Sequence, residues 1–581
     1  MYYVDKKVYE AKDLQEKTQA LKSDISVLLQ FVGGRLEDAF PLVPYLLYKV
    51  SSQENPKNVT FKAIADGDLE INDNARFLAL EILNEELWQR LLPLTNKYSS
   101  VEFALAVVND EKDEKWSGVV ATPKSILRLS NALLAVKAGE SVADICCGEG
   151  SYLVASALEE PNAHYSGYEL NVIGVAGASM KAELLEADIK LSLGDVFSLA
   201  EATEIPKFDK IFAHYPWGIR LKNMKGSSQY LDKIRGRYRK LAPATSSDWI
   251  FNSLICDLLA ENGKAIGIMT NGSTWNSLDT SLREYFVEHK LIECVITLPA
   301  RMFPNTGIAT TLVVFSHNNE GVRMIDATNL CQQGRRQNEF SDEDIRQIVQ
   351  ALSEDSEYSK VVSVEALRDN EYILNLSRYI MGDIHFKNGV AFESVISNIS
   401  RGAQITASQL DEMVSDEVTN MQYLMIGNIQ DGLIDAELPY LKEIEPRYER
   451  YCLKHNALII SKNGYPFKVA VASVEPGQQI LANGNLYIVE LDEEKVNPYY
   501  LQAFFNSDKG NAALKSITVG ATILNIGVDK LKKLEIPLPA LEEQKRIAEE
   551  YQVTLMEVEV TKLRLERAIN KLHHIWNEEG E

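Results

Sequence analysis

The sequence predicts an α/β fold whose largest part is a doubly wound, mostly parallel sheet. Between about residues 118 and 316, short apolar runs alternate with amphipathic stretches of ten or more residues, as strands alternate with covering helices in such sheets. A glycine-containing turn follows the first run and leads into a helical stretch, which is typical of sheets that bind nucleotides. The predicted strands include SVADI, YSGYEL, KIFAHY, KAIGIMT, CVITL and TLVVFS.

A helical N-terminal domain is expected to precede this sheet. Apolar side chains recur there at steps of three and four residues between charged neighbours. They are Leu21, Ile25, Leu28, Leu80, Leu83, Leu87 and Leu91. The charged stretch from Val108 to Trp116, VNDEKDEKW, has no periodicity and is typical of an exposed linker. We therefore expect a helical domain over residues 1–115 and the α/β domain over residues 116–380.

A different texture begins after residue 380. Shorter β-rich runs such as NALIISK and NLYIVEL are broken there by Gly and Asn, which predicts a separate α+β domain over residues 381–540. Residues 541–581 predict a terminal helix with a heptad seam. Its apolar positions alternate four and three apart: Tyr551, Leu555, Val558, Lys562, Leu565, Ile569, Leu572 and Trp576. Two interpretations are open, a coiled coil with another chain and a helix docked on its own domain.

Composition narrows the class of protein. The 581 residues carry 60 Lys and Arg against 83 Asp and Glu, so the net charge is −23 and binding of nucleic acid has to depend on local surfaces. The six cysteines have neither a disulfide framework nor zinc-ligand spacing, and we expect no metal site. Without an apolar leader or an 18-residue apolar stretch, the sequence predicts no membrane contact and a cytoplasmic location.

Three acids at the ends of successive predicted strands suggest a nucleoside site. The first strand ends at Asp144 in the turn DICCGEG, where Gly148 and Gly150 allow a ligand to approach the backbone. Glu169 ends the next strand, where a carboxylate can accept both hydroxyls of a ribose. In GDVF, Asp195 and Phe197 follow the third and could hold an adenine ring. A phosphate loop of the form GxxxxGK[ST] is absent, which disfavours nucleotide hydrolysis.

With these motifs in place, DICCGEGSYL, YEL, GDVF and FDKIFAHYPWG resemble the DNA adenine methyltransferases that serve as modification subunits of type I restriction-modification systems. The resemblance covers about residues 115–380 and includes GVVATPKSI, whose counterpart helps to hold the methionine part of the cofactor. It implies a Rossmann-like methyltransferase domain that uses S-adenosyl-L-methionine. Cofactor binding is thus expected at Thr122, Asp144, Cys147, Gly148, Gly150, Glu169, Asp195 and Phe197.

The same resemblance places catalysis at His214, Tyr215, Pro216 and Trp217. The family shows Asn-Pro-Pro-aromatic there, with the Asn oxygen and the first Pro carbonyl accepting the amino hydrogens of the base. His214 can accept one such bond through an unprotonated ring nitrogen, and Trp217 can stack on a flipped base. Cytosine carbon-5 methylation is disfavoured, because the Pro-Cys pair of that family is absent. The rival is a catalytically inactive DNA-recognition subunit that keeps the fold.

A second resemblance begins where the first ends. YLMIGNIQDGLID, NALIISKNG and the stretch NPYYLQAFFNSDKGNAALKSITVGATILNIGVDKLKKLEIPLPALEEQKRIAE resemble one target-recognition domain and one spacer helix of a type I specificity subunit. Those subunits usually carry two such halves. The resemblance therefore implies double-stranded DNA as a partner, and a homodimer or pairing with a related methyltransferase or specificity subunit through the C-terminal helix. It also allows a restriction subunit as partner and implies a bacterial or archaeal cytoplasm.

Overall fold

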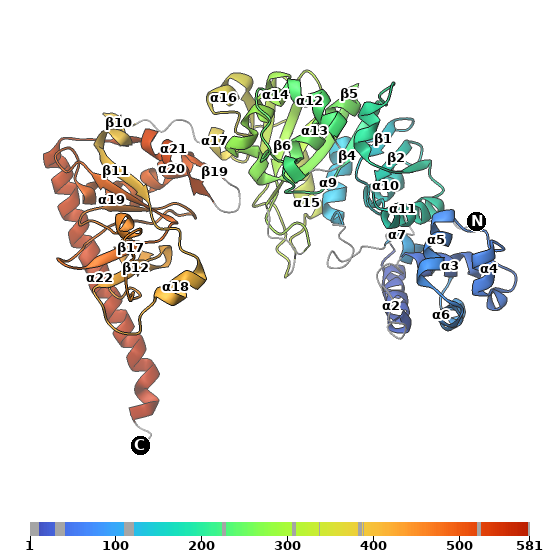
Figure 1. Ribbon diagram of the computed structural model, residues 1–581, viewed down its shortest axis with the longest axis horizontal. Coiled ribbons are helices and arrows are strands. Elements are labelled where there is room, and N and C mark those ends of the chain that lie inside the picture. The colour runs from blue at the N-terminus through green and yellow to red at the C-terminus, as the bar shows by residue number, and fades with distance from the viewer. Residues whose placement is uncertain are drawn as a thin grey trace. The chain divides into compact units, whose positions relative to one another are not determined.

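The chain divides into two compact units in a computed structural model, Met1–Leu376 and Ser377–Glu581 (Figure 1). Each unit is described by itself. The described residues are 11–29, 41–109, 121–223, 228–304, 309–335, 337–380, 386, 388–519 and 524–578. Most of the predicted linker at 108–116 lies outside these ranges.

The first unit begins with short helices, as the periodicity predicts. They are α2 (Lys12–Leu29), α3 (Leu42–Ser51), α4 (Phe61–Asp66), α5 (Asp73–Ile82), α6 (Glu85–Leu91) and α7 (Ser100–Val108). One expected apolar stripe is interrupted, because Leu83 is extended and the Asn84 side chain accepts a bond from the Leu87 amide to start α6. The interpretation of Leu80 as part of this stripe is wrong, since its side chain is exposed.

A nine-stranded sheet forms the centre of the first unit and confirms the predicted α/β class. Its order is β3-β2-β1-β4-β5-β7-β6-β8-β9. The first five strands are parallel, β7 runs antiparallel between β5 and β6, β8 is parallel to β6, and β9 is antiparallel to β8. The strands are β1 (Ser141–Asp144), β2 (His164–Glu169), β3 (Ile189–Leu193), β4 (Phe208–Ala213), β5 (Leu259–Thr270), β6 (Ile292–Thr297), β7 (Thr310–Phe315), β8 (Gly321–Asp326) and β9 (Ser359–Ser363).

The strands after β1 are added first on one side of it (β2, β3) and then on the other side (β4, β5), so the order of the strands reverses between β1 and β4. Doubly wound sheets bind ligands at the carboxyl ends of the two strands at such a point. The helices of this region are α9 (Lys124–Leu134), α10 (Ser151–Glu159), α11 (Val172–Leu185), α12 (Ser228–Ile234), α13 (Asp248–Leu258), α14 (Thr280–Glu288), α15 (Asp342–Gln350) and α16 (Val364–Asp369). Both α9 and α13 contact β5.

The N-terminal helices share one continuous hydrophobic core with this sheet. Polar bonds also join them to α11, which follows β2: Tyr45 Oη donates to Glu183 at 2.5 Å, and Asn74 Nδ2 donates to Ser179 Oγ at 3.1 Å. The helical region is therefore packed onto the helix that begins beside Glu169.

The second unit combines small sheets with helices. A four-stranded sheet has the order β11-β18-β15-β16, and β12 pairs with β17. The main strands are β10 (Gly389–Ala391), β11 (Ile396–Arg401), β12 (Met421–Leu424), β13 (Ile429–Gln430), β14 (Leu433–Ile434), β15 (Leu458–Ser461), β16 (Val469–Val471), β17 (Gln479–Ala482), β18 (Leu486–Leu491), β19 (Thr518–Val519), β20 (Asn525–Ile526) and β21 (Glu535–Pro537). The helices are α17 (Ser377–Ile380), α18 (Ala407–Met413), α19 (Pro498–Asn506), α20 (Asp508–Ser516), α21 (Val528–Lys533) and α22 (Leu541–Glu578).

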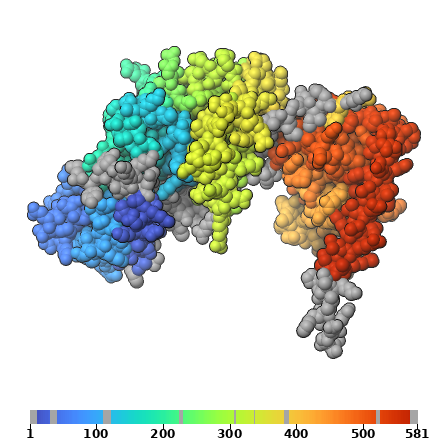
Figure 2. Space-filling view, turned by 180° about the vertical axis from the view of Figure 1, so that it is seen from behind, coloured from blue at the N-terminus to red at the C-terminus, as the bar shows by residue number. Residues whose placement is uncertain are grey.

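The predicted heptad seam on α22 lies in two environments. Its first positions face the second unit: Tyr551 Oη accepts a bond from Asn506 on α19 at 3.0 Å, and Lys562 pairs with Asp431 at 2.6 Å. Leu565 and Ile569, further along, are exposed. Figure 2 shows α22 in red along one side of this unit, and Figure 1 shows its C-terminal part extending past the strands. The side chains of Leu572 and Trp576 lie outside the described part of the chain.

Within the described ranges, no helix is both long enough and apolar enough to cross a bilayer.

Candidate active site

The turn after β1 is built around two glycines with positive φ. Gly148 has φ 51° and Gly150 has φ 78°, a region that side chains strain to adopt. A Cβ on Gly150 would also lie 3.1 Å from the Ala178 Cβ on α11, so this position allows no larger residue without a shift. The turn is closed by a bond from the Gly150 amide to the Cys147 carbonyl at 2.7 Å. Helix α10 therefore starts directly behind a narrow backbone turn, as the DICCGEG motif predicts.

Glu169, at the end of β2, holds this turn in place. Its carboxylate accepts from the Gly148 amide at 2.8 Å and from the amides of Leu170 and Asn171 at 2.8 Å each. A carboxylate offers about four acceptor positions, so one position is left for a ligand hydroxyl. Glu169 thus couples the glycine turn to the start of α11, a role that the sequence interpretation as a ribose acceptor did not include.

All three predicted acids act electrostatically on Cys146. Burial, with added repulsion from Glu169, Asp144 and Asp195, raises the pKa of the Cys146 thiol well above its usual value. Asp144 is itself buried, and this burial together with the nearby Glu169 raises its pKa to about 8, although the Cys146 amide donates to it. A cation in this region would be favoured, because the charges of three carboxyl groups act on it together.

Asp195 and Phe197 follow β3. The Asp195 side chain caps the short helix η4 (Val196–Glu201) by accepting from the Phe197 amide at 3.0 Å. The Phe197 ring is buried between Tyr230 at 5.2 Å and Phe251 at 5.1 Å, measured between ring centroids. Most of this ring is therefore used in packing, and only a small part can contact a ligand.

His214 follows β4 and contacts Thr122 directly. Its Nδ1 lies 2.8 Å from the buried Thr122 Oγ1, and its ring packs at 4.9 Å from Trp217 and 5.0 Å from Phe303. Burial lowers the pKa of His214 to about 4, so the ring is neutral at physiological pH. Thr122 thus lies beside the predicted catalytic loop.

Tyr215 anchors the same loop from below. Its side chain is buried, its Oη donates to Asn252 Oδ1 at 2.8 Å, and its ring stacks on Phe251 at 4.8 Å and 6°. Phe251 also packs against Phe197, so one ring of α13 joins the third strand end to the predicted catalytic loop. The structure therefore brings the two groups of predicted residues together.

Pro216 and Trp217 complete the loop. Pro216 is exposed, whereas the indole of Trp217 donates to the Ile268 carbonyl at 2.9 Å and meets Phe303 edge-on at 4.7 Å. Phe303 contacts both aromatic rings of the loop and was not expected from the sequence. Together with Cys146 and Phe251, it is a site residue that only the packing identifies.

In the described residues, no group of three His, Cys, Asp or Glu side chains is arranged to hold a metal ion.

Comparisons with known proteins agree in both halves. Residues 101–385 match the family of N-6 DNA methylases, and residues 397–568 match the type I restriction modification DNA specificity domain. A crystal structure of a type I restriction-modification methyltransferase subunit from Streptococcus thermophilus has the same fold. The matched region covers 62% of this chain and 99% of the S. thermophilus chain, with a TM-score of 0.51 and 19% identity.

Curated relatives are about a quarter identical to this chain over the aligned residues alone. The type I restriction enzyme MjaVIII methylase subunit of Methanocaldococcus jannaschii is 27% identical over 51% of this chain and 57% of its own length. The type I restriction enzyme StySPI specificity subunit of Salmonella potsdam is 26% identical over 30% of this chain and 37% of its own length. The chain therefore spans little more than half of the methylase relative and about a third of the specificity relative.

Proposed function

We propose that this chain, which joins an N-6 DNA methylase domain to a type I DNA specificity domain, transfers a methyl group from S-adenosyl-L-methionine to the 6-amino group of adenine in DNA. One observation carries the proposal. Asp144, Glu169 and Asp195 lie at or just after the ends of β1, β2 and β3, where all three repel negative charge on Cys146, and the Phe251 ring packs against both Phe197 after β3 and Tyr215 in the loop after β4. A site for a cationic nucleoside therefore lies next to a loop that can hold a base.

The residues present fit the proposed cofactor. Gly148 and Gly150 form the turn with positive φ and without side chains that would cover its backbone, and the acceptor position left on Glu169 suits a ribose hydroxyl. Asp144, with its raised pKa, lies where a sulfonium would favour its ionised form. When bound, S-adenosyl-L-methionine supplies the methyl group. The residues of this chain bind it, orient it and hold it beside the loop.

His214 is proposed to orient the target amino group. In the tautomer whose Nδ1–H donates to Thr122 Oγ1, Nε2 is unprotonated and can accept one amino hydrogen of the base, and this is the tautomer we propose. The Tyr215 carbonyl is the second proposed acceptor, held by the buried Tyr215 side chain. An adenine has to leave the duplex to reach them, and Trp217 and Phe303 offer aromatic surface for it.

A methyl-transfer assay with the full chain tests the proposal. Tritiated cofactor and genomic DNA are incubated with the parent, His214→Ala, and His164→Ala as matched control, because His164 is exposed at the start of β2 and pairs with Asp188. We expect tritium in N6-methyladenine for the parent and the control. Absence of transfer by a parent that binds cofactor and DNA would refute the proposal in favour of the inactive recognition subunit.

We further propose that two copies pair through α22, so that two specificity domains read two half-sites. An apolar strip on this helix, Val553, Met556, Val560 and Leu563, is spaced three and four apart and is 46 to 62% exposed. It lies on the side opposite to Tyr551 and Lys562, which face the unit itself. Pairing with a related specificity subunit would use the same strip, and a restriction subunit is a further proposed partner.

Sedimentation velocity tests the pairing. Val560→Glu with Leu563→Glu is expected to convert a dimer into a monomer, because two charges would be buried without partners. Thr554→Glu with Thr561→Glu adds the same charge at exposed polar positions of α22 and is expected to remain dimeric. A parent that sediments as a monomer, or a control that dissociates equally, would contradict pairing through this strip.

A further inference from the structure

The segment that follows the His214–Trp217 loop has a charge opposite to that of the chain. Residues 219–240 contain eight Lys or Arg and one Asp, within a sequence whose net charge is −23. Such a local reversal needs a reason, because like charges gathered on one segment repel one another.

The start of this segment is hydrogen-bonded to residues 243–247, which follow its end. The Leu221 amide donates to the Thr245 carbonyl at 2.9 Å, the Lys222 amide donates to the Pro243 carbonyl at 3.0 Å, and the Ser247 amide donates to the Ile219 carbonyl at 2.9 Å. The chain thus leaves the catalytic loop and returns to the same place. We call residues 219–222 and 239–240 the two arms of the segment. Four cations on these arms are exposed: Arg220, Lys222, Arg239 and Lys240.

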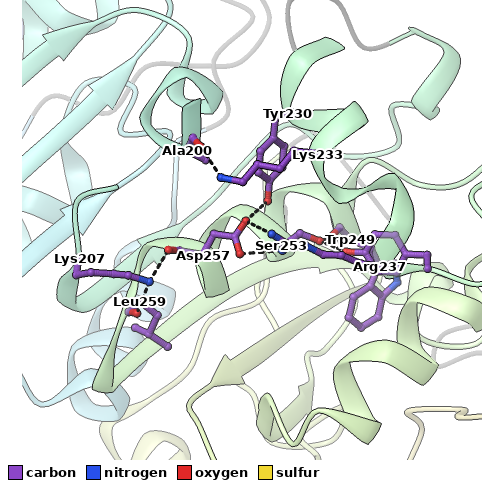
Figure 3. A network of polar contacts seen from close by, with 10 residues as sticks. Ala200, Lys207, Tyr230, Lys233, Arg237, Trp249, Ser253, Asp257 and Leu259 are labelled. Carbon is purple, nitrogen blue, oxygen red and sulfur yellow. Dashed lines mark hydrogen bonds and ion pairs between the residues drawn. The ribbon is translucent and has the colours of Figure 1, made fainter. Parts of the chain in front are cut away.

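A partly buried network holds residues 230–238 of this segment (Figure 3). Arg237 donates to both oxygens of Asp257 on α13 at 2.8 and 2.9 Å, and Tyr230 Oη donates to the same carboxylate at 3.0 Å. Tyr238 bonds to Ser253 on the same helix, and Lys233 Nζ donates to the Ala200 carbonyl at 2.8 Å. Asp257 thereby neutralises Arg237 and ties the segment to α13, which also carries Phe251 and Asn252.

Few acids oppose the exposed cations. Arg239 pairs with Glu284 at 3.2 Å, and Asp232 pairs with Arg235 at 3.3 Å. Arg220 donates instead to the Ala244 carbonyl at 3.0 Å. Among the described residues, no salt bridge involves Arg220, Lys222 or Lys240, so their positive charge is available to a ligand.

We propose that Arg220, Lys222, Arg239 and Lys240 bind backbone phosphates of duplex DNA beside the target base. The proposal rests on the proposed function, in which DNA is the substrate. Overall repulsion between the chain and DNA has to be offset locally, and phosphate contacts set the register of a protein on the duplex without reading its sequence. Because the arms follow Trp217 directly, phosphates held there would lie close to a base in the loop.

Salt-dependent DNA binding tests this assignment. The affinity of the full chain for a fluorescently labelled duplex is measured between 50 and 200 mM KCl. The slope of log K against log salt concentration then counts the phosphate contacts. Arg220→Gln, Lys222→Gln and Lys240→Gln are combined in one variant. The matched control combines Lys57→Gln, Lys137→Gln and Lys190→Gln, which remove the same charge from exposed positions elsewhere in the first unit.

We expect the slope to become shallower by about 0.9 for each lost contact, roughly 2 to 3 in total, and the affinity to fall at least about tenfold. The control is expected to keep the parental slope, and both variants the parental affinity for S-adenosyl-L-methionine. An unchanged slope in the first variant, or an equal loss in the control, would overturn the assignment. If the triple variant shows this change of slope but the parent transfers no methyl group, only the proposed function is refuted.

Discussion

His214 provides the most direct test of the proposed chemistry. An acceptor for the amino group of a base has to be neutral, because an imidazolium offers only donors. Burial lowers the pKa of His214 from 6.5 to about 4, which corresponds to about 3 kcal/mol against the charged form. At pH 7 only about one ring in a thousand is then protonated. The rate of methyl transfer by the parent should therefore be flat from about pH 6 to 8 and should fall only below about pH 5.

Two substitutions separate the acceptor from the charge. His214→Asn keeps an acceptor that cannot titrate, so its methyl-transfer rate should stay within about tenfold of the parent and lose the acid limb. His214→Ala removes the acceptor and should lower the rate by about 100-fold or more, as for other positioned transition-state bonds. Cofactor affinity should change little in either variant. The measurement is single-turnover tritium transfer to a saturating DNA substrate from pH 5 to 8.

Stability supplies a second readout for the same residue. The unfolded chain takes up a proton on His214 near pH 6.5, whereas the folded chain does so only near pH 4. The free energy of unfolding is therefore highest above pH 6.5 and decreases as the pH falls from about 6.5 to about 4. His214→Asn should remove this pH dependence. An active parent whose rate is unaffected by His214→Ala would refute the acceptor role and leave the Tyr215 carbonyl as the orienting group.

Three further predictions concern the architecture of the site. The pKa of Asp144 is raised to about 8, so between about pH 4 and 8 the folded chain keeps a proton that the unfolded chain has lost. The stability of the cofactor-free protein therefore falls as the pH rises through this window. Asp144→Asn should remove this fall, measured as the thermal midpoint against pH. Gly150→Ala should destabilise the first unit by about 1 to 3 kcal/mol in urea unfolding, because φ is 78° and Ala178 is close, and Gly139→Ala, with φ 79° but no atom within 4 Å, isolates the backbone part. Tyr215→Phe should cost about 1 to 3 kcal/mol, because the buried oxygen of Asn252 loses its donor, and an unchanged unfolding midpoint would contradict this.

The strand ends could be predicted from the sequence, whereas the contacts between them could not. Asp144, Glu169 and Asp195 follow apolar runs that are easy to recognise, and parallel strands bring such ends to one edge. The effect of all three acids on Cys146 depends on the folded arrangement of these strand ends, which the sequence does not give. Phe251 lies in the middle of a helix and looks like an ordinary core residue, yet its ring packs against both Phe197 after β3 and Tyr215 after β4.

Local capping also decides what periodicity cannot. Leu80 to Leu91 reads as one amphipathic stripe, but the Asn84 side chain satisfies an amide at the start of a new helix, and the chain turns there. Leu80 is exposed near the end of the first helix, whereas Leu83, Leu87 and Leu91 are buried. The sequence does not predict strands β8 and β9, because both are short and neither has a regular alternation of buried and exposed residues or a long buried run.

The terminal helix shows why a heptad pattern identifies a packed face without identifying its partner. Tyr551 and Lys562 satisfy the pattern by facing their own unit, through Asn506 and Asp431. A second helix cannot occupy that face over the same turns. The proposed pairing between chains therefore has to use the strip around Val560 or the exposed turns after it. One face of α22 would then hold the helix on its own unit, while the opposite face stays available to a second copy.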